Sequence, residues 1–113
     1  MPQDVSHGIL SGLRILEIGH FVAAPFCTRL LADLGADIIK IEPPSGDPVR
    51  QWGQQVNGTS LWWSIHGRNK RSVTLNLKHP EATSIVRRLV AGCDAMVEVR
   101  EGRGERLDRG VTR

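Results

Sequence analysis

Side chains that can contact a ligand lie in turns that follow apolar segments of the sequence. His20 follows the segment 14–18, and a histidine there can act as a general base or as a hydrogen-bond donor to a ligand. Lys78 follows the alternating segment 73–77, and its ammonium group suits a phosphate. With no second histidine, cysteine or acid at motif spacing, a structural role for His20 in a hydrogen-bonded loop stays open. The pattern predicts ligand contacts at these turns and specifies no catalytic group.

The turn at residues 19–24 precedes a predicted helix, and free amides at a helix amino terminus attract phosphate or carboxylate. A dinucleotide fingerprint needs glycines at the positions of Gly19, Phe21 and Ala24, and only the first is met. Glu42 stands about 20 residues further on, where a ribose-binding acid is expected. The alternative is that Glu42 is a solvated strand end. One glycine and one acid are weak support for a dinucleotide site.

Two further features have both a functional and a structural interpretation. The cationic run at residues 68–71 can clamp a ligand phosphate or form a solvated turn. Trp52, Trp62 and Trp63 lie in a long loop rich in proline and glycine, where they can stack on a ligand base or pack the loop. The sequence leaves both alternatives open.

The elements that must position these turns alternate between strand and helix. Apolar, β-branched segments predict strands at 14–18, 37–41, 73–77 and 95–99. Helices are predicted from Pro25 to Gly35 and from His79 and Pro80 to Gly92, with a short helical segment at 60–65. This alternation predicts an α/β fold, a Rossmann-like parallel sheet with flanking helices, whose ligands bind beyond the carboxyl ends of the strands.

Apolar residues at helical spacing predict which face of each helix packs against the sheet. In the first helix these are Phe26, Leu30, Leu31 and Leu34. In the second helix they are Ala82, Ile85, Val86, Leu89 and Val90.

Length and composition are those of one globular domain. The 113 residues are 40% hydrophobic and 24% charged. No apolar run approaches the roughly 18 to 20 residues that cross a bilayer, so we do not expect a membrane role. We expect a cytoplasmic location. The net charge is only +3, and no zinc-finger pattern or RNP-like aromatic motif accompanies it, so nucleic-acid binding is not expected.

The two cysteines, Cys27 and Cys93, lack zinc-ligand spacing. We therefore expect reduced, buried thiols and no structural metal.

Three blocks of the sequence resemble a known family. Residues 30–44, 46–50 and 69–78 closely resemble the opening of class III CoA-transferases. The family includes formyl-CoA transferase, carnitine CoA-transferase, bile-acid CoA-transferase and α-methylacyl-CoA racemase. The resemblance runs in unbroken order from Leu13 to Glu98.

The resemblance implies a CoA-binding domain that is incomplete relative to the full family domain. It covers a Rossmann-like CoA-binding segment at 13–99, preceded by an extension at 1–12. The tail at 100–113 has few apolar residues among glycines and charges, so it is expected to be disordered. CoA or acyl-CoA is the implied substrate, with no covalently bound cofactor. Family members form interlocked homodimers, which is not expected of so short a chain. The implied CoA contacts are His20, Phe21, Val22, Ala23, Pro43, Leu75 and Lys78.

Departures from the family pattern limit what this chain can do. Val22 replaces a glutamine that some transferases use with acyl intermediates, which argues against formyl or oxalyl specialisation. Gly67 stands where an asparagine is frequent, and residues 99–103 replace an Asn-Phe-Arg-Pro-Gly motif. The family's catalytic aspartate lies beyond residue 113, so no catalytic residue is assigned.

The sequence thus predicts the amino-terminal CoA-binding part of a class III CoA-transferase, which moves CoA between an acyl-CoA and a carboxylic acid. A truncated product or fragment of this kind is expected to be inactive alone. The alternatives are a family racemase or isomerase acting on acyl-CoA, and a non-catalytic nucleotide-binding module.

Overall fold

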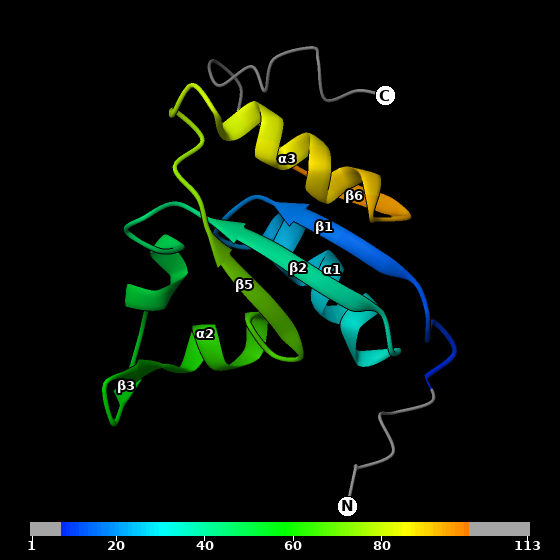
Figure 1. Ribbon diagram of the computed structural model, residues 1–113. Coiled ribbons are helices and arrows are strands. Elements are labelled where there is room, and N and C mark those ends of the chain that lie inside the picture. Colours follow the sequence, from blue (N-terminus) through cyan, green and yellow to red (C-terminus); the bar gives the residue numbers. More distant parts are fainter. Residues whose placement is uncertain (1–7, 100–113) are drawn as a thin grey trace, which may run out of the picture.

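The computed structural model describes residues 8–99, which form one α/β unit (Figure 1). The elements are β1 (Arg14–Ile18), α1 (Ala23–Asp33), β2 (Asp37–Glu42), the 3-10 helix η1 (Pro48–Gln51), β3 (Gln55–Val56), β4 (Thr59–Ser60), α2 (Leu61–His66), β5 (Lys70–Thr74), α3 (Ala82–Ala91) and β6 (Ala95–Glu98). None of the described helices is long and apolar enough to cross a membrane.

Four of the strands form a parallel sheet in the order β5-β2-β1-β6. The chain moves outward from β1 to β2 and β5, and then returns to place β6 on the other side of β1. This order is that of the first half of a Rossmann fold, with the reversal between β1 and β6. The predicted α/β class with a parallel sheet is confirmed. Because the strands are parallel, their carboxyl ends meet at one edge of the sheet.

Three predicted strands lie within one residue of the observed ones, and the remaining one is displaced. β5 runs from Lys70 to Thr74, where residues 73–77 were expected. Its ladder with β2 begins at the Ile38–Lys70 pair, so the polar start of the strand is part of the sheet. As an edge strand it is largely exposed and shows no apolar alternation. Leu75 lies just past the strand, although its amide still donates to the Glu42 carbonyl at 2.9 Å.

One face of the sheet is covered by α3 and is apolar (Figure 1). Alternate side chains of β1 and β2 pack there against Val86 of α3. α3 begins at Ala82, two residues after Pro80, so the expected start at His79 and Pro80 was early. Ala82 and Val86 are buried as predicted, whereas Ile85 is exposed.

The opposite face is covered by α1, and its packing differs from the prediction (Figure 1). α1 begins at Ala23, so Pro25 is its third residue and not its first. The helix buries Ala24, Pro25, Thr28 and Ala32. Of the expected apolar face, Phe26, Leu30 and Leu34 are 45%, 44% and 47% exposed. Small residues face the sheet because long charged side chains, described below, occupy the space beneath the helix.

α1 ends as the sequence predicts, at a left-handed glycine. Gly35 has φ 104°, a conformation that residues with a side chain rarely adopt. Gly8 lies against it, and a Cβ added to Gly35 would be 2.8 Å from the Gly8 Cα. The Leu10 amide donates to the Leu34 carbonyl at 2.9 Å. The described part of the predicted extension therefore packs on the end of α1. The domain boundary at residue 13 stays a prediction, and the predicted disordered tail at 100–113 lies outside the described residues.

Candidate functional site

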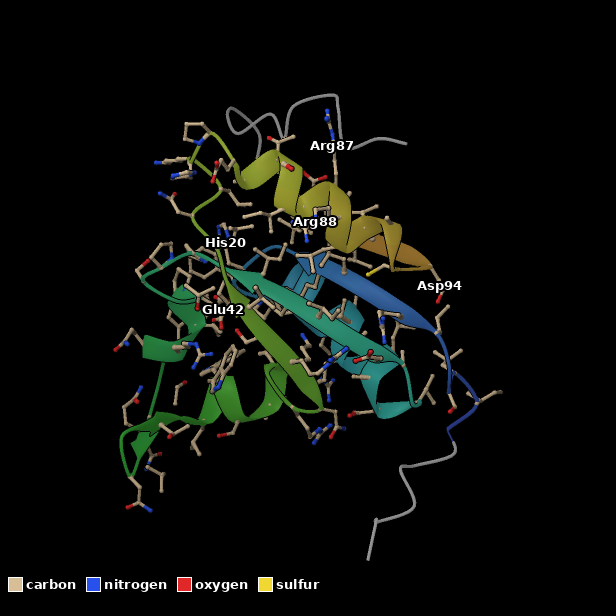
Figure 2. The ribbon with its side chains drawn as sticks, viewed as in Figure 1. His20, Glu42, Arg87, Arg88 and Asp94 are labelled. Carbon is tan, nitrogen blue, oxygen red and sulfur yellow. The ribbon has the colours of Figure 1, made fainter. Side chains whose placement is uncertain are left out.

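The predicted ligand contacts lie along the carboxyl edge of the sheet. His20, Phe21 and Val22 form the turn after β1, and Ala23 is the first residue of α1. Three more lie beyond β2 and β5, namely Pro43 directly after β2, Leu75 directly after β5, and Lys78 three residues later. Figure 2 shows His20 and Glu42 near this edge. The amino terminus of α1 points the same way, and its N-cap residue, Val22, offers no side-chain acceptor to the first amides.

His20 is exposed, and its ring contacts the Phe21 ring with centroids 5.0 Å apart. Within residues 8–99 its side chain makes no hydrogen bond, and the interpretation as a hydrogen-bonded loop histidine stays a prediction. Lys78 is also exposed, and its amide donates to the Asn76 side chain at 3.1 Å. Both side chains are therefore accessible to a ligand from solvent.

Phe21 has a left-handed backbone, with φ 64°, which is uncommon for a bulky residue. Two buried side chains hold this turn. The Phe21 amide donates to Asp47 Oδ1 at 3.2 Å, and Lys40 Nζ donates to the Gly19 carbonyl at 3.0 Å. Lys40 and Asp47 also pair with each other. The conformation of the turn is thus fixed by two buried residues, one in β2 and one in the loop that follows β2.

Lys40 and Asp47 belong to a buried charge network that sequence reasoning missed. Glu17 of β1 accepts hydrogen bonds from Thr28, Lys40 and Lys70, the last at 2.7 Å. Glu17, Lys40 and Asp47 are at most 1% exposed. Burial lowers the pKa of Lys70, which the neighbouring Glu17 opposes. Two lysines balance two carboxylates, so the charges compensate within the core.

Glu42, at the end of β2, is buried, so the expectation of a solvated strand end is wrong. Its oxygens accept from Arg50 at 2.7 and 2.8 Å, from Ser72, and from the Asp47 amide at 2.9 Å. Burial alone raises the pKa of Glu42, but these hydrogen bonds outweigh it and lower the pKa to about 2. Because its oxygens are occupied, Glu42 is poorly suited to bind a ribose hydroxyl.

The cationic run at residues 68–71 begins in a turn where Arg68 and Asn69 are exposed, which fits the solvated-turn interpretation, and the phosphate-clamp role stays a prediction. It lies at the amino end of β5, the edge opposite the candidate site. Arg68 and Asn69 bind the Asp33 carboxylate, Arg71 binds Asp37, and Lys70 belongs to the buried network. The side chains of the run therefore hold α1, β2 and β5 together.

Aromatic rings pack the long loop between β2 and β5 against the turn after β1. Phe21 contacts Trp52 with centroids 5.0 Å apart, Trp52 contacts Trp62 at 5.8 Å, and Trp62 stacks on His66 at 5.7 Å. Trp63 lies under the Arg50 guanidinium, 3.6 Å from its carbon. The tryptophans therefore pack the loop, which was one of the two predicted roles.

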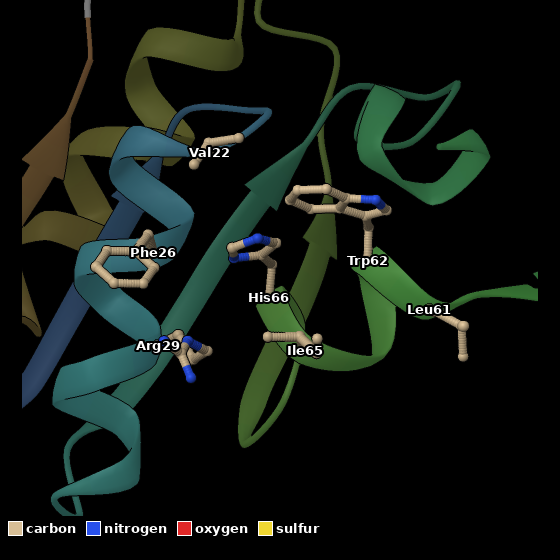
Figure 3. Close-up of a pocket in the computed structure, with 7 residues that line it drawn as sticks. All are labelled: Val22, Phe26, Arg29, Leu61, Trp62, Ile65 and His66. Carbon is tan, nitrogen blue, oxygen red and sulfur yellow. The ribbon is translucent and has the colours of Figure 1, made fainter. Parts of the chain in front are cut away.

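A pocket of about 420 Å³ opens between α1 and α2 (Figure 3). Its lining is mostly apolar and includes Val22 from the turn after β1. The lining residues are Val22, Phe26, Arg29, Leu61, Trp62, Ile65 and His66.

Cys27 is exposed and Cys93 is partly buried, and both are free thiols. The expectation of a buried thiol is therefore wrong for Cys27. Among residues 8–99, no group of three or more His, Cys, Asp or Glu side chains is arranged to hold a metal ion.

The fold and the edge turns define a Rossmann-like α/β protein, and comparisons with known proteins define its family. Residues 10–111 match CoA-transferase family III. The chain is 50% identical over 91 residues to "Succinyl-CoA--D-citramalate CoA-transferase" of Chloroflexus aurantiacus, covering 79% of this chain and 23% of that protein. It is 43% identical over 101 residues to human "Succinyl-CoA:glutarate CoA-transferase", covering 86% and 23%.

A solved structure agrees with these sequence matches. The crystal structure of a CAIB/BAIF family protein from Brucella suis superimposes with a TM-score of 0.73 and 38% identity, covering 80% of this chain and 25% of that one. The chain belongs to CoA-transferase family III, as the resemblance predicted. It spans about a quarter of the length of these relatives.

Proposed function

We propose that this chain is the CoA-binding part of a class III CoA-transferase, and that CoA binds along the carboxyl edge of the sheet. Family membership supports CoA as the ligand, and the conformation of the turn after β1 supports the carboxyl edge of the sheet as its binding site. The observation that carries the proposal is the left-handed Phe21, fixed by Asp47 beside the amino terminus of α1. Strain of this kind persists only where surrounding contacts enforce it, and it is common at ligand sites.

In the proposed complex, the CoA phosphates lie near the amino terminus of α1, where free amides and the helix dipole favour negative charge. Lys78 supplies a nearby cation. Backbone and apolar surface from His20, Phe21, Val22, Ala23, Pro43 and Leu75 lines the remainder of the site.

Transfer of CoA is proposed for the family protein and not for the described segment alone. Glu42 and Asp47, the acids near the edge turns, are already engaged by Arg50 and Lys40. A carboxylate nucleophile must be free to reach the thioester carbon. Transfer is proposed in preference to racemisation because the relatives compared above are named CoA-transferases. A cytoplasmic location and the family's homodimer stay predictions.

Calorimetry with CoA and with NAD tests the proposal on the 113-residue chain. We expect CoA to bind and NAD to bind at least about tenfold more weakly, a difference of about 1.4 kcal/mol. Preference for NAD would support the dinucleotide alternative, and no binding of CoA at saturating concentration would reject the proposed site.

A further inference from the structure

Arg29 of α1 is mostly buried, and among residues 8–99 its buried Nε has no hydrogen-bond partner. Its side chain is 17% exposed. The guanidinium forms a long ion pair with the Asp33 carboxylate, 3.9 Å away, which is too far for a hydrogen bond. Asp33 is in any case held by Arg68 at 2.6 Å and Asn69 at 3.0 Å. The Arg29 guanidinium also lies over the Phe26 ring, 4.9 Å from its centroid.

A guanidinium has five donors in a planar fork, and burying it without an acceptor is costly. A contact with one aromatic face offsets only part of that cost. Such a group in the wall of a pocket is therefore suited to an anionic ligand, and a carboxylate can match the fork with two parallel hydrogen bonds.

A second unpartnered polar group lies in the wall of the same pocket. His66 of α2 is 5% exposed, and its Nδ1 has no hydrogen-bond partner. Burial lowers the pKa of His66, and the charges of Lys70 and Arg29 lower it further. Figure 3 shows Arg29 and His66 beside each other, facing the pocket from different helices.

The pocket is continuous with the proposed CoA site through Val22, which belongs both to the turn after β1 and to the pocket lining. Apart from Arg29 and His66, the pocket is lined by apolar side chains, those of Val22, Phe26, Leu61, Trp62 and Ile65. The volume of about 420 Å³ is ample for a short acyl chain.

We propose that this pocket binds the acyl group of a dicarboxylic acyl-CoA, with its methylene groups on the apolar wall and its distal carboxylate on Arg29 and His66. The inference rests on the proposed CoA site, and it adds the pocket and the residues that select the acyl group. A purely aliphatic acyl group would leave Arg29 Nε and His66 Nδ1 without hydrogen-bond partners, and so it is disfavoured.

Titration calorimetry with succinyl-CoA and butyryl-CoA tests the inference, because these thioesters share a four-carbon chain and differ in a terminal carboxylate or methyl group. We expect the wild-type chain to bind succinyl-CoA about tenfold or more tightly. Arg29→Gln should bring the affinity for succinyl-CoA down to that for butyryl-CoA. Arg29→Lys, which keeps the charge but loses the planar fork, should retain part of the preference.

Arg88→Gln is the matched control, since Arg88 is exposed on α3, on the other face of the sheet, and its loss should leave the preference intact. Equal affinity of the wild-type chain for the two thioesters would overturn the inference while leaving the CoA site standing, and this result does not depend on any variant folding. An equal loss in Arg88→Gln and Arg29→Gln would also overturn it, because the effect would then be one of net charge. Failure of CoA itself to bind would reject the proposed function.

Discussion

Lys40 Nζ lies 2.9 Å from Asp47 Oδ2, although both side chains are 1% exposed. Lys40 also donates to Glu17 and to the Gly19 carbonyl, and Asp47 accepts from the Phe21 amide. One buried ion pair therefore connects the centre of the sheet to the turn that forms the proposed CoA site.

Lys40→Met should strongly destabilise the chain, because it leaves Asp47 buried without its cation and removes one of the two cations that pair with Glu17. Breaking a buried pair in this way costs about 3 to 5 kcal/mol. Urea unfolding measures the free energy difference. The control is Arg71→Gln, which breaks an exposed pair with Asp37 and should cost at most about 1 kcal/mol. If both variants lost the same free energy of unfolding, burial of the charge network would contribute nothing to stability.

Glu42 should make the chain less stable in acid. Its pKa in the folded protein is about 2, against an ordinary value of 4.5. A carboxyl group with a lowered folded pKa stabilises the fold above its unfolded pKa, and this contribution is lost as the pH falls from about 4.5 to about 2. The loss is on the order of 2 kcal/mol, allowing for solvent screening of the partly exposed Arg50. Unfolding measured against pH should show a smaller slope in this window for Glu42→Gln, and an unchanged slope would contradict the assignment.

The alternation of strand and helix was predictable because β1, β2 and β6 are mostly apolar and end at turn residues. The pairing of the two charges inside β1 and β2 depends on how the strands align in the sheet. Glu17 and Lys40 are direct partners in the parallel register, so opposite charges lie side by side on one face. The register between two strands cannot be read from the sequence of either strand alone, so the pairing of these two charges was not predicted.

The buried face of α1 could not be inferred from its apolar spacing, for a related reason. Phe26 and Leu30 look like core residues, but the sheet beneath the helix is filled by Glu17, Lys40 and Lys70. Only small residues such as Ala24 fit against it. Phe26 instead lines the pocket shared with α2.

Lys78→Ala should weaken CoA binding about tenfold or more, because one charge-assisted phosphate contact is typically worth about 1.5 to 3 kcal/mol. Calorimetry at fixed ionic strength gives the affinity ratio. Arg71→Gln removes a charge of the same sign at the opposite edge of the sheet and should change the affinity less than about twofold. If both variants lost affinity equally, the effect would be one of net charge, and Lys78 would not be a contact.

The 113-residue chain should form no covalent acyl intermediate with any acyl-CoA. A nucleophilic carboxylate must lie within about 3 to 3.5 Å of the thioester carbon. Glu42 is held by Arg50 and Asp47 by Lys40, so neither can approach a thioester without breaking an ion pair. Hydroxylamine or borohydride trapping followed by mass spectrometry should find no acyl adduct. A stoichiometric adduct on Glu42, Asp47 or Glu98 would make this short chain an enzyme by itself.

The proposed CoA site is tested most directly by titrating the ¹⁵N-labelled chain with CoA and following the backbone amide resonances. We predict that the largest shifts occur at residues 19–24 and at Leu75 and Lys78, along the carboxyl edge of the sheet. Residues 68–71, at the amino edge, should remain unperturbed. Shifts confined to residues 68–71, or none at saturating CoA, would contradict the account.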